Sequence, residues 1–410
     1  MTDHSHDHGL SRRSLLQAGL AAAPLMFAPA ALGQTRPGER ERILVILEMS
    51  GGNDGLNTVI PYGDDAYYRH RPKIGIRPEK VRKLDDHFGL SEGMVGFEKL
   101  YKDGNVAIVH GAGYADPSFS HFTSMAYWHT AAPNSGEQYG WVGRLADQMA
   151  PAAPANFLIN IGATQSLAVR AHNHVPVVFD NPDNFTREMF FEEGAALNAA
   201  PETGKVANSA QAYLRDIARS ANESSALVRK AWSDYRSPVD YGVTDLGLRR
   251  VAAMIGAGLP ARLYYTAYAN NAFDTHVTQN DLQPRLLTYT SDAVSAFMQD
   301  MQRLGRADDV TLMVFSEFGR RVPENTSLGT DHGAANVMFV VGKKVKGGHY
   351  GERPSLTKLD AGDNLQFTTD FRRVYGTMAQ NWLGQPATPK LLNGTFQPFD
   401  MIARTRHTPA

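Results

Sequence analysis

The sequence predicts an α/β domain whose mostly parallel sheet is flanked by helices on both faces. Its short apolar runs are uninterrupted, which is typical of strands that are buried on both faces. Segments with helical periodicity separate these runs, and alternating strands and helices favour a parallel sheet. Polar and charged residues follow several of the runs, which is where an α/β protein places its ligand sites.

The first strand is predicted at Ile43–Met49, and the glycines of loop 50–55 permit tight turns after it. The other predicted elements are a helix that ends at Gly104, strand 105–110 ended by 111–113, a helix from Ser118 or Ser120 through Trp128, helix 246–258, strand 262–268, a long helix with 286–304 on its buried face, strands 309–315 and 337–342, and helix 370–383.

The middle of the chain differs from the rest. Residues 180–240 are polar and alanine-rich, with helical periodicity at 210–221 and 226–235. We therefore expect a helical insertion at about 180–258 within one α/β domain that spans residues 34–410.

Residues 1–33 have the features of an export signal. Arg12 and Arg13 precede an alanine-rich apolar stretch, and small residues up to Gly33 offer a cleavage point. The arginine pair followed by Leu15 and Leu16 indicates the twin-arginine export machinery, so we expect a periplasmic or secreted protein. An uncleaved anchor and a chance arginine pair are the alternatives.

Composition excludes several classes of function. The formal net charge is −1 and 20% of residues are charged, which argues against a nucleic-acid partner. With 0 cysteines, the chain has no thiolate zinc site, iron–sulfur cluster or cysteine nucleophile. No apolar run in the mature chain reaches the roughly 18 residues that a membrane span needs, so we expect no span there.

Two acids belong to the first predicted strand and its loop. Glu48 lies inside the apolar run, and Asp54 follows it. A lone acid in such a strand is costly to bury unless it is paired or bound to a metal. Both are candidate metal ligands, and for Glu48 a buried ion pair with an arginine is the alternative.

Hydroxyl and imidazole groups mark the predicted start of a helix. Ser118 and Ser120 would lie near free backbone amides, which favour an anion and can activate a nucleophile, although serine also caps helices routinely. His121 is a candidate base or metal ligand beside them. Asp274 and His276 are two positions apart in the loop after strand 262–268, where an Asp-x-His pair suits a transition metal.

The segment from 311 to 342 carries the most information. Two apolar runs bracket a polar loop in which Glu317 directly follows one strand and His332 precedes the next, with Arg320 between them. Acids and histidines can hold one or two divalent ions (Zn, Mn, Ca or Fe), and arginine can stabilise charge that develops on an ester. The set has the parts for metal-assisted displacement at phosphorus or sulfur, with a surface loop of ordinary salt bridges as the alternative.

Five motifs together resemble the bacterial exported family called domain of unknown function 1501, over nearly the whole mature chain. They are 47–61, Ser120-His-Phe with Trp128, Phe273-Asp-Thr-His276, Phe315-Ser-Glu-Phe-Gly-Arg320 and Thr330-Asp-His-Gly333. That family is similar to the alkaline phosphatase and sulfatase superfamily. The resemblance implies an alkaline-phosphatase-like fold.

Residue by residue, the resemblance implies roles for several positions. Glu48 matches the superfamily's first-strand acid and Ser120, ahead of Ser118, its nucleophile. Asp274 and His276 match the superfamily's mid-chain Asp/His pair. Glu317 matches the acid of its later turn, and His332 matches its late histidine. Phe318 departs from the pattern because a metal-binding His or Asn is expected there, and no cysteine can become formylglycine.

The leading functional hypothesis is an exported metal-dependent hydrolase of small phosphate or sulfate esters. Phe318 favours the alternative of a catalytically inactive binding or assembly protein with a partner in the cell envelope. A serine esterase is the third hypothesis, since Gly52-Asn-Asp54 is similar to a block found in one lipase class.

Overall fold

The computed structural model describes residues 41–185 and 224–403. The predicted export signal and the predicted helical segment 210–221 lie outside these residues, so both stay predictions. Among the helices that are described, none combines the length and the apolar character needed to cross a membrane.

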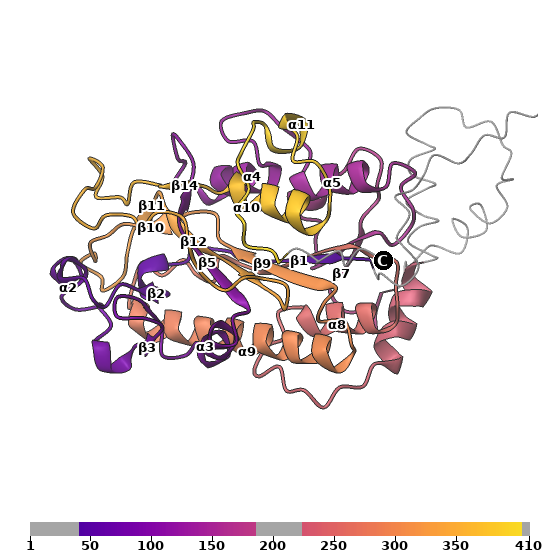
Figure 1. The fold of residues 1–410 in the computed structure, drawn as a ribbon, viewed down its shortest axis with the longest axis horizontal. Coiled ribbons are helices and arrows are strands. Elements are labelled where there is room, and N and C mark those ends of the chain that lie inside the picture. Colours follow the sequence, from indigo (N-terminus) through magenta and orange to yellow (C-terminus); the bar gives the residue numbers. More distant parts are fainter. Residues whose placement is uncertain (1–40, 186–223, 404–410) are drawn as a thin grey trace, which may run out of the picture. The chain divides into compact units, whose positions relative to one another are not determined.

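A nine-stranded sheet runs through the middle of the domain (Figure 1). Its strands are β1 (Ile43–Met49), β5 (Val106–Gly113), β6 (Leu158–Ile161), β7 (Val177–Phe179), β8 (Leu263–Tyr268), β9 (Val310–Phe315), β12 (Asn336–Val341), β13 (Gly348–Tyr350) and β14 (Thr369–Asp370). The order is β13-β5-β12-β9-β1-β8-β6-β7, with β14 paired to β5. Only β12 pairs antiparallel to its neighbours, so the predicted mostly parallel sheet is confirmed.

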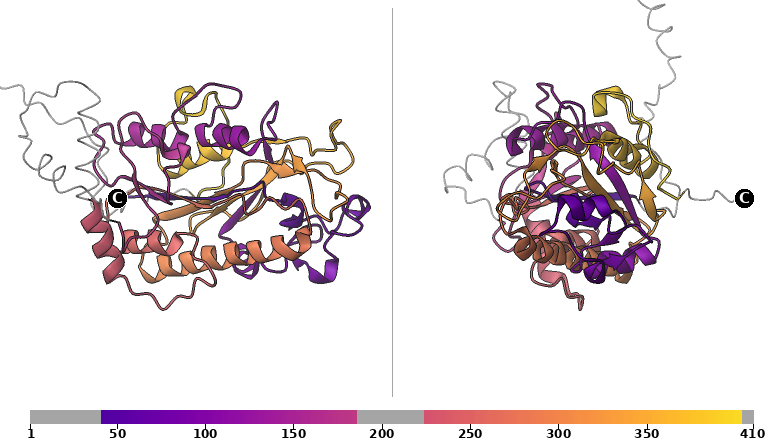
Figure 2. Two further views of the ribbon diagram at one scale, coloured as in Figure 1. Left: turned by 180° about the vertical axis from the view of Figure 1, so that it is seen from behind. Right: turned by 90° about the vertical axis from the view of Figure 1, so that its left-hand side faces the viewer.

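Helices cover both faces of this sheet, and the layers are visible from the further directions of Figure 2. One face carries α3 (Val95–Lys102), α8 (Leu248–Gly256) and α9 (Gln279–Arg303), and the other carries α4 (His121–Thr130), α5 (Trp141–Met149), α10 (Arg372–Gly376) and α11 (Pro389–Leu392). Because side chains alternate along a strand, β1 supplies both cores. Val45 and Leu47 pack in the first, and Leu44 and Ile46 in the second.

Shorter elements complete the described fold. A three-stranded sheet consists of β2 (Val59–Ile60), β3 (Arg82–Lys83) and β4 (Gly89–Leu90), and a hairpin of β10 (Gly319–Arg320) and β11 (His332–Gly333). The remaining helical pieces are α2 (Asp65–His70), the 3-10 turns Gly55–Asn57, Pro78–Lys80 and Leu167–Val169, and the π-helix Thr377–Trp382. Residues 224–234, which lie within the predicted insertion, are helical.

Three details differ from the sequence-based expectations. Strand β5 continues through 111–113 instead of ending before these residues. Gly111 allows another segment to approach the strand, since a Cβ on it would lie 2.0 Å from Oγ1 of Thr368. The short strands β6 and β7 were not predicted. Predicted helix 370–383 divides into α10 and the π-helix, and α11 follows it.

The loop after β1 is fixed by a buried ion pair. Nη1 of Arg71 lies 2.6 Å from Oδ2 of Asp54, and the two side chains are 0% and 1% exposed. Asp54 also accepts hydrogen bonds from the backbone N–H of Leu56 at 3.0 Å and from Nε2 of Gln279 at 2.6 Å. The pair therefore joins this loop to α2 and to the start of α9.

Removing one partner of this pair should destabilise the fold strongly. The Arg71→Met substitution leaves the charge of Asp54 buried without its partner, so we expect the free energy of unfolding to fall by about 3–5 kcal/mol. Urea denaturation measures this free energy of unfolding. Arg82→Met is the matched control, because Arg82 and Glu98 are 32% and 18% exposed and such a pair contributes at most about 1 kcal/mol. Equal losses in the two variants would contradict the prediction.

Candidate metal centre

The topology of the sheet brings the predicted site residues to one edge. Strands β1, β8 and β9 are parallel, so the loops that follow them leave from the same edge. Strand β12 runs the other way, and the segment that precedes it therefore begins at this edge as well. Asp274, Glu317 and His332 come from these segments, and His121 begins α4 after β5.

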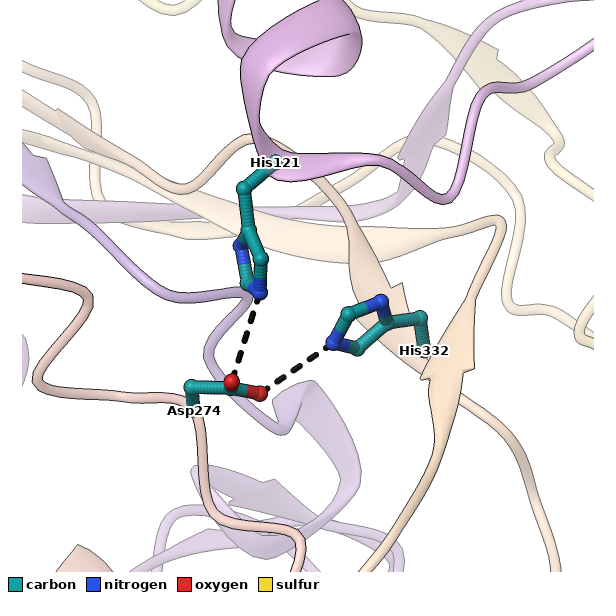
Figure 3. Close-up of side chains that lie close together, drawn as sticks. All are labelled: His121, Asp274 and His332. Carbon is teal, nitrogen blue, oxygen red and sulfur yellow. Dashed lines mark hydrogen bonds and ion pairs between the residues drawn. The ribbon is translucent and has the colours of Figure 1, made fainter.

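Three side chains meet at the centre of this edge (Figure 3). Nε2 of His332 lies 3.1 Å from Oδ1 of Asp274, and Nε2 of His121 lies 3.4 Å from Oδ2 of the same carboxylate. One ligand atom from each of the three residues lies within 4.8 Å of the other two. We call His121, Asp274 and His332 the metal cluster, because their ligand atoms are close enough together to hold one ion. Within residues 41–185 and 224–403, these three residues form the group whose ligand atoms are this close.

Glu317 lies behind His121 and holds it in place. Oε1 of Glu317 is 2.8 Å from Nδ1 of His121, and the backbone N–H of Gly51 donates to both carboxylate oxygens at 2.9 and 3.1 Å. The side chain of Glu317 is 0% exposed. A carboxylate that accepts from Nδ1 leaves Nε2 free for a metal, which is the usual arrangement behind a ligating histidine.

Arg320 lies beneath the cluster with its side chain 0% exposed. Its Nη2 is 2.7 Å from Oδ1 of Asp274, and its guanidinium also donates to backbone carbonyls, namely those of Gly51, Gly52, Phe273 and Thr330. We expected this guanidinium to face an anionic ester. Its N–H groups are instead engaged inside the protein, so Arg320 positions Asp274.

Two further groups border the cluster. Nε2 of His276 lies 3.1 Å from Oδ1 of Asp274 and 2.9 Å from Nε2 of His332, while its Nδ1 lies 3.3 Å from Oδ1 of Asp331. The predicted Asp274–His276 pair is thus brought together at this edge. Phe318, the residue that departs from the family pattern, packs its ring against His332 and His121 at centroid distances of 4.4 and 5.0 Å.

Neighbouring groups shift the pKa values of all three cluster residues. The hydrogen bond that His121 donates to Glu317 raises the pKa of His121, and burial lowers that of His332. Burial opposes the ionisation of Asp274, but the hydrogen bond and charge of Arg320 prevail and lower its pKa to about 2. Asp274 is therefore a carboxylate at neutral pH.

The hydrogen bonds at the far side of each ring leave the Nε2 atoms of His121 and His332 directed at Asp274. Nδ1 of His332 is 2.7 Å from the carbonyl oxygen of Phe119, so Nδ1 carries a hydrogen and a neutral His332 presents a lone pair at Nε2. Nε2 of His121 is buried and has no hydrogen-bond partner. A cation bound by this cluster would contact the carboxylate of Asp274 and the two Nε2 atoms. Two imidazoles and one carboxylate fit a catalytic zinc or a related transition metal with an open position.

Two predicted ligands use their oxygens elsewhere. Oε2 of Glu48 is 2.7 Å from Nε2 of His129 and accepts from the hydroxyl of Tyr265, all three being buried. The sequence-based alternative for Glu48 named an arginine, whereas a histidine and a tyrosine hold it. Asp54 is occupied by Arg71, as described above.

The predicted nucleophile lies next to the cluster. Ser120 is the N-cap of α4, one residue before His121, and its hydroxyl makes no capping hydrogen bond. Oγ of Ser118 accepts from the backbone N–H of Ser120 at 3.3 Å.

Asp331 and the carbonyl of Phe119 were not predicted as partners of the site histidines. The adjacency of Asp331 to His332 was the available signal for the former.

Several solved structures resemble the chain at low sequence identity. The C-terminal periplasmic domain of EcEptC from Escherichia coli, in complex with Zn, is 12% identical, with 76% of each chain covered and a TM-score of 0.37. A protein in the alkaline phosphatase superfamily from Vibrio parahaemolyticus is 11% identical over 87% of this chain and 71% of that one, with a TM-score of 0.39. The PsFucS1 sulfatase from Pseudoalteromonas sp. is 11% identical over 88% and 71%, also with a TM-score of 0.39.

No curated protein matches the sequence significantly. A family model described as a protein of unknown function, DUF1501, matches residues 41–373. This match extends from two residues before β1 to the second residue of α10 and includes every residue of the metal cluster. The chain therefore belongs to the DUF1501 family.

Proposed function

We propose that the protein is an exported, metal-dependent hydrolase of phosphate or sulfate esters. The observation that carries this proposal is the position of two ring nitrogens on one ionised carboxylate. Nε2 of His121, which is buried and has no hydrogen-bond partner, lies 3.4 Å from one oxygen of Asp274, and Nε2 of His332 lies 3.1 Å from the other. These three residues would hold one divalent ion, with zinc as the best fit to the donor set. When bound, the ion would neutralise charge on the nonbridging oxygens of the ester.

The residues around the cluster divide the remaining tasks. Ser120 supplies the hydroxyl that attacks the ester, because it lies beside the cluster and makes no capping bond. The free amides at the start of α4 favour an anion at the same place. Glu317 fixes the ring of His121, and Arg320 fixes the carboxylate of Asp274.

Loss of Asp274 should abolish specific metal binding. We expect wild-type mature protein to bind about one zinc ion per chain, and Asp274→Ala to weaken zinc binding by at least about 100-fold, beyond the cost of typical second-shell changes. Calorimetric titration of metal-free protein with zinc measures the stoichiometry and the affinity. Asp331→Ala, the same change at the edge of the site, should cost about tenfold or less. Equal stoichiometry and affinity in wild type and Asp274→Ala would refute the assigned ligand set.

The pH dependence of zinc binding should depend on Glu317. Because the hydrogen bond to Glu317 raises the pKa of His121, zinc must displace a proton from His121 up to a higher pH than from a free imidazole. Apparent affinity should therefore fall as pH decreases through that raised pKa. Glu317→Gln removes the charge but keeps an acceptor, so the midpoint of this fall should move to lower pH. An unchanged or higher midpoint would show that Glu317 does not control His121.

Replacement of Ser120 should separate catalysis from metal binding. Against a panel of phosphate and sulfate esters, we expect Ser120→Ala to lower kcat/KM by about 10³-fold or more while zinc affinity is retained. Ser118→Ala tests the neighbouring hydroxyl and should have a much smaller effect. Metal binding without hydrolysis by the wild type would instead favour the envelope binding protein. Labelling of Ser120 by a fluorophosphonate in metal-free protein would favour a serine esterase.

A further inference from the structure

Four exposed apolar residues belong to the chain segments that border the metal cluster. Phe119, Phe122, Val277 and Leu328 are 38%, 89%, 59% and 40% exposed, and we refer to these four as the apolar rim. Nine large apolar side chains are exposed within the described part of the chain, so nearly half of them belong to the rim. Single exposed apolar residues are ordinary, whereas a concentration of them marks a binding surface.

Two members of the rim lie on the side of the cluster formed by α4. Phe122 directly follows the cluster residue His121 in the first turn of that helix. The backbone carbonyl of Phe119 accepts the hydrogen bond from Nδ1 of His332 at 2.7 Å. These two aromatic residues are thus tied to two of the three cluster residues.

The other two members lie on two adjoining segments: Val277 on the one that supplies Asp274, and Leu328 in the loop between β10 and β11. Val277 directly follows His276, whose Nε2 is 3.1 Å from the carboxylate of Asp274. Leu328 lies beside it: its carbonyl accepts from the backbone N–H of Gln279 at 2.9 Å. The adjoining Gly329 packs so closely that a Cβ there would lie 2.3 Å from the carbonyl carbon of His276.

We propose that the rim binds an apolar alkyl or aryl group of the ester, so that the substrate is an amphiphile with one anionic head. This inference rests on the proposed function, which puts the anionic head at the cluster. A fully hydrophilic ester would leave the rim exposed to water, although burial of apolar side chains is favourable. An apolar group attached to the head would cover it.

The polar centre of the site argues against other occupants. A membrane surface or a second copy of the chain laid across the rim would also cover Asp274, whose side chain is 31% exposed and ionised. Burying that carboxylate further without a new partner is costly. An amphiphilic ester avoids this cost, because its anionic head binds the metal-loaded cluster while its apolar group covers the rim.

The test compares binding of methylphosphonate and octylphosphonate, below the micelle concentration, to zinc-loaded mature protein by calorimetry. Each buried CH₂ contributes up to about 0.8 kcal/mol, which corresponds to about fourfold in affinity, and partial contact along the rim should still give octylphosphonate at least about a tenfold advantage. In the Phe122→Ala, Leu328→Ala double variant this advantage should shrink severalfold, while methylphosphonate affinity is retained. Val243→Ala is the matched control, because Val243 is 77% exposed and follows Gly242, which contacts Asp292 in the middle of α9, outside the rim.

The outcomes separate this inference from the proposed function. Equal affinity for both phosphonates overturns the amphiphilic substrate and leaves the hydrolase proposal standing. Failure of both to bind overturns the hydrolase proposal and this inference with it. Vesicle sedimentation with phosphatidylcholine and the oligomeric state in solution complete the test. Vesicle binding or a dimer that is lost in the double variant would identify the rim as a membrane or subunit interface and overturn the substrate assignment.

Discussion

The geometry of the site depends on one buried guanidinium. Arg320 donates to the carbonyls of Gly51 and Gly52 after β1, of Phe273 after β8 and of Thr330 before β12. These contacts join three segments that no single strand pairing connects. Arginine suits this position because its planar donors diverge in fixed directions, which the point charge of a lysine cannot reproduce. The charge that remains is balanced by Asp274, which turns a structural clamp into part of the metal cluster.

Most of the sheet could be predicted because buried strands have a simple signature. The apolar run of β1 was predicted at its exact bounds, and β8, β9 and β12 within a residue or two. The direction of β12 has no such signature, since an apolar run reads alike in either direction. That direction nevertheless decides the site, because it brings His332 to the edge where β1 and β9 end.

The sequence predicted which residues lie at the site more reliably than it predicted what each of them contacts. The premise that Glu48 needs a partner was sound, since it is buried and hydrogen-bonded, and Asp54 is likewise buried and paired. The identity of the partner depends on residues far along the chain: His129 is 81 positions from Glu48. Local sequence cannot distinguish an acid paired with His129 from one that faces a metal. Asp274 and His332 differ because tertiary contacts leave their acceptors facing one another.

Phe318 stands where the family resemblance implies a metal-binding residue, and its contacts show what takes that ligand's place. Its ring packs against His121 and His332 and presses on Gly52, where a Cβ would lie 2.1 Å from the ring. The ring thus occupies the space between two imidazoles and the backbone of Gly52. An apolar neighbour of this kind lowers the local dielectric and strengthens the attraction between a cation and the carboxylate of Asp274. If the proposed single ion is bound there, the backbone amides at the start of α4 would be the second source of positive potential.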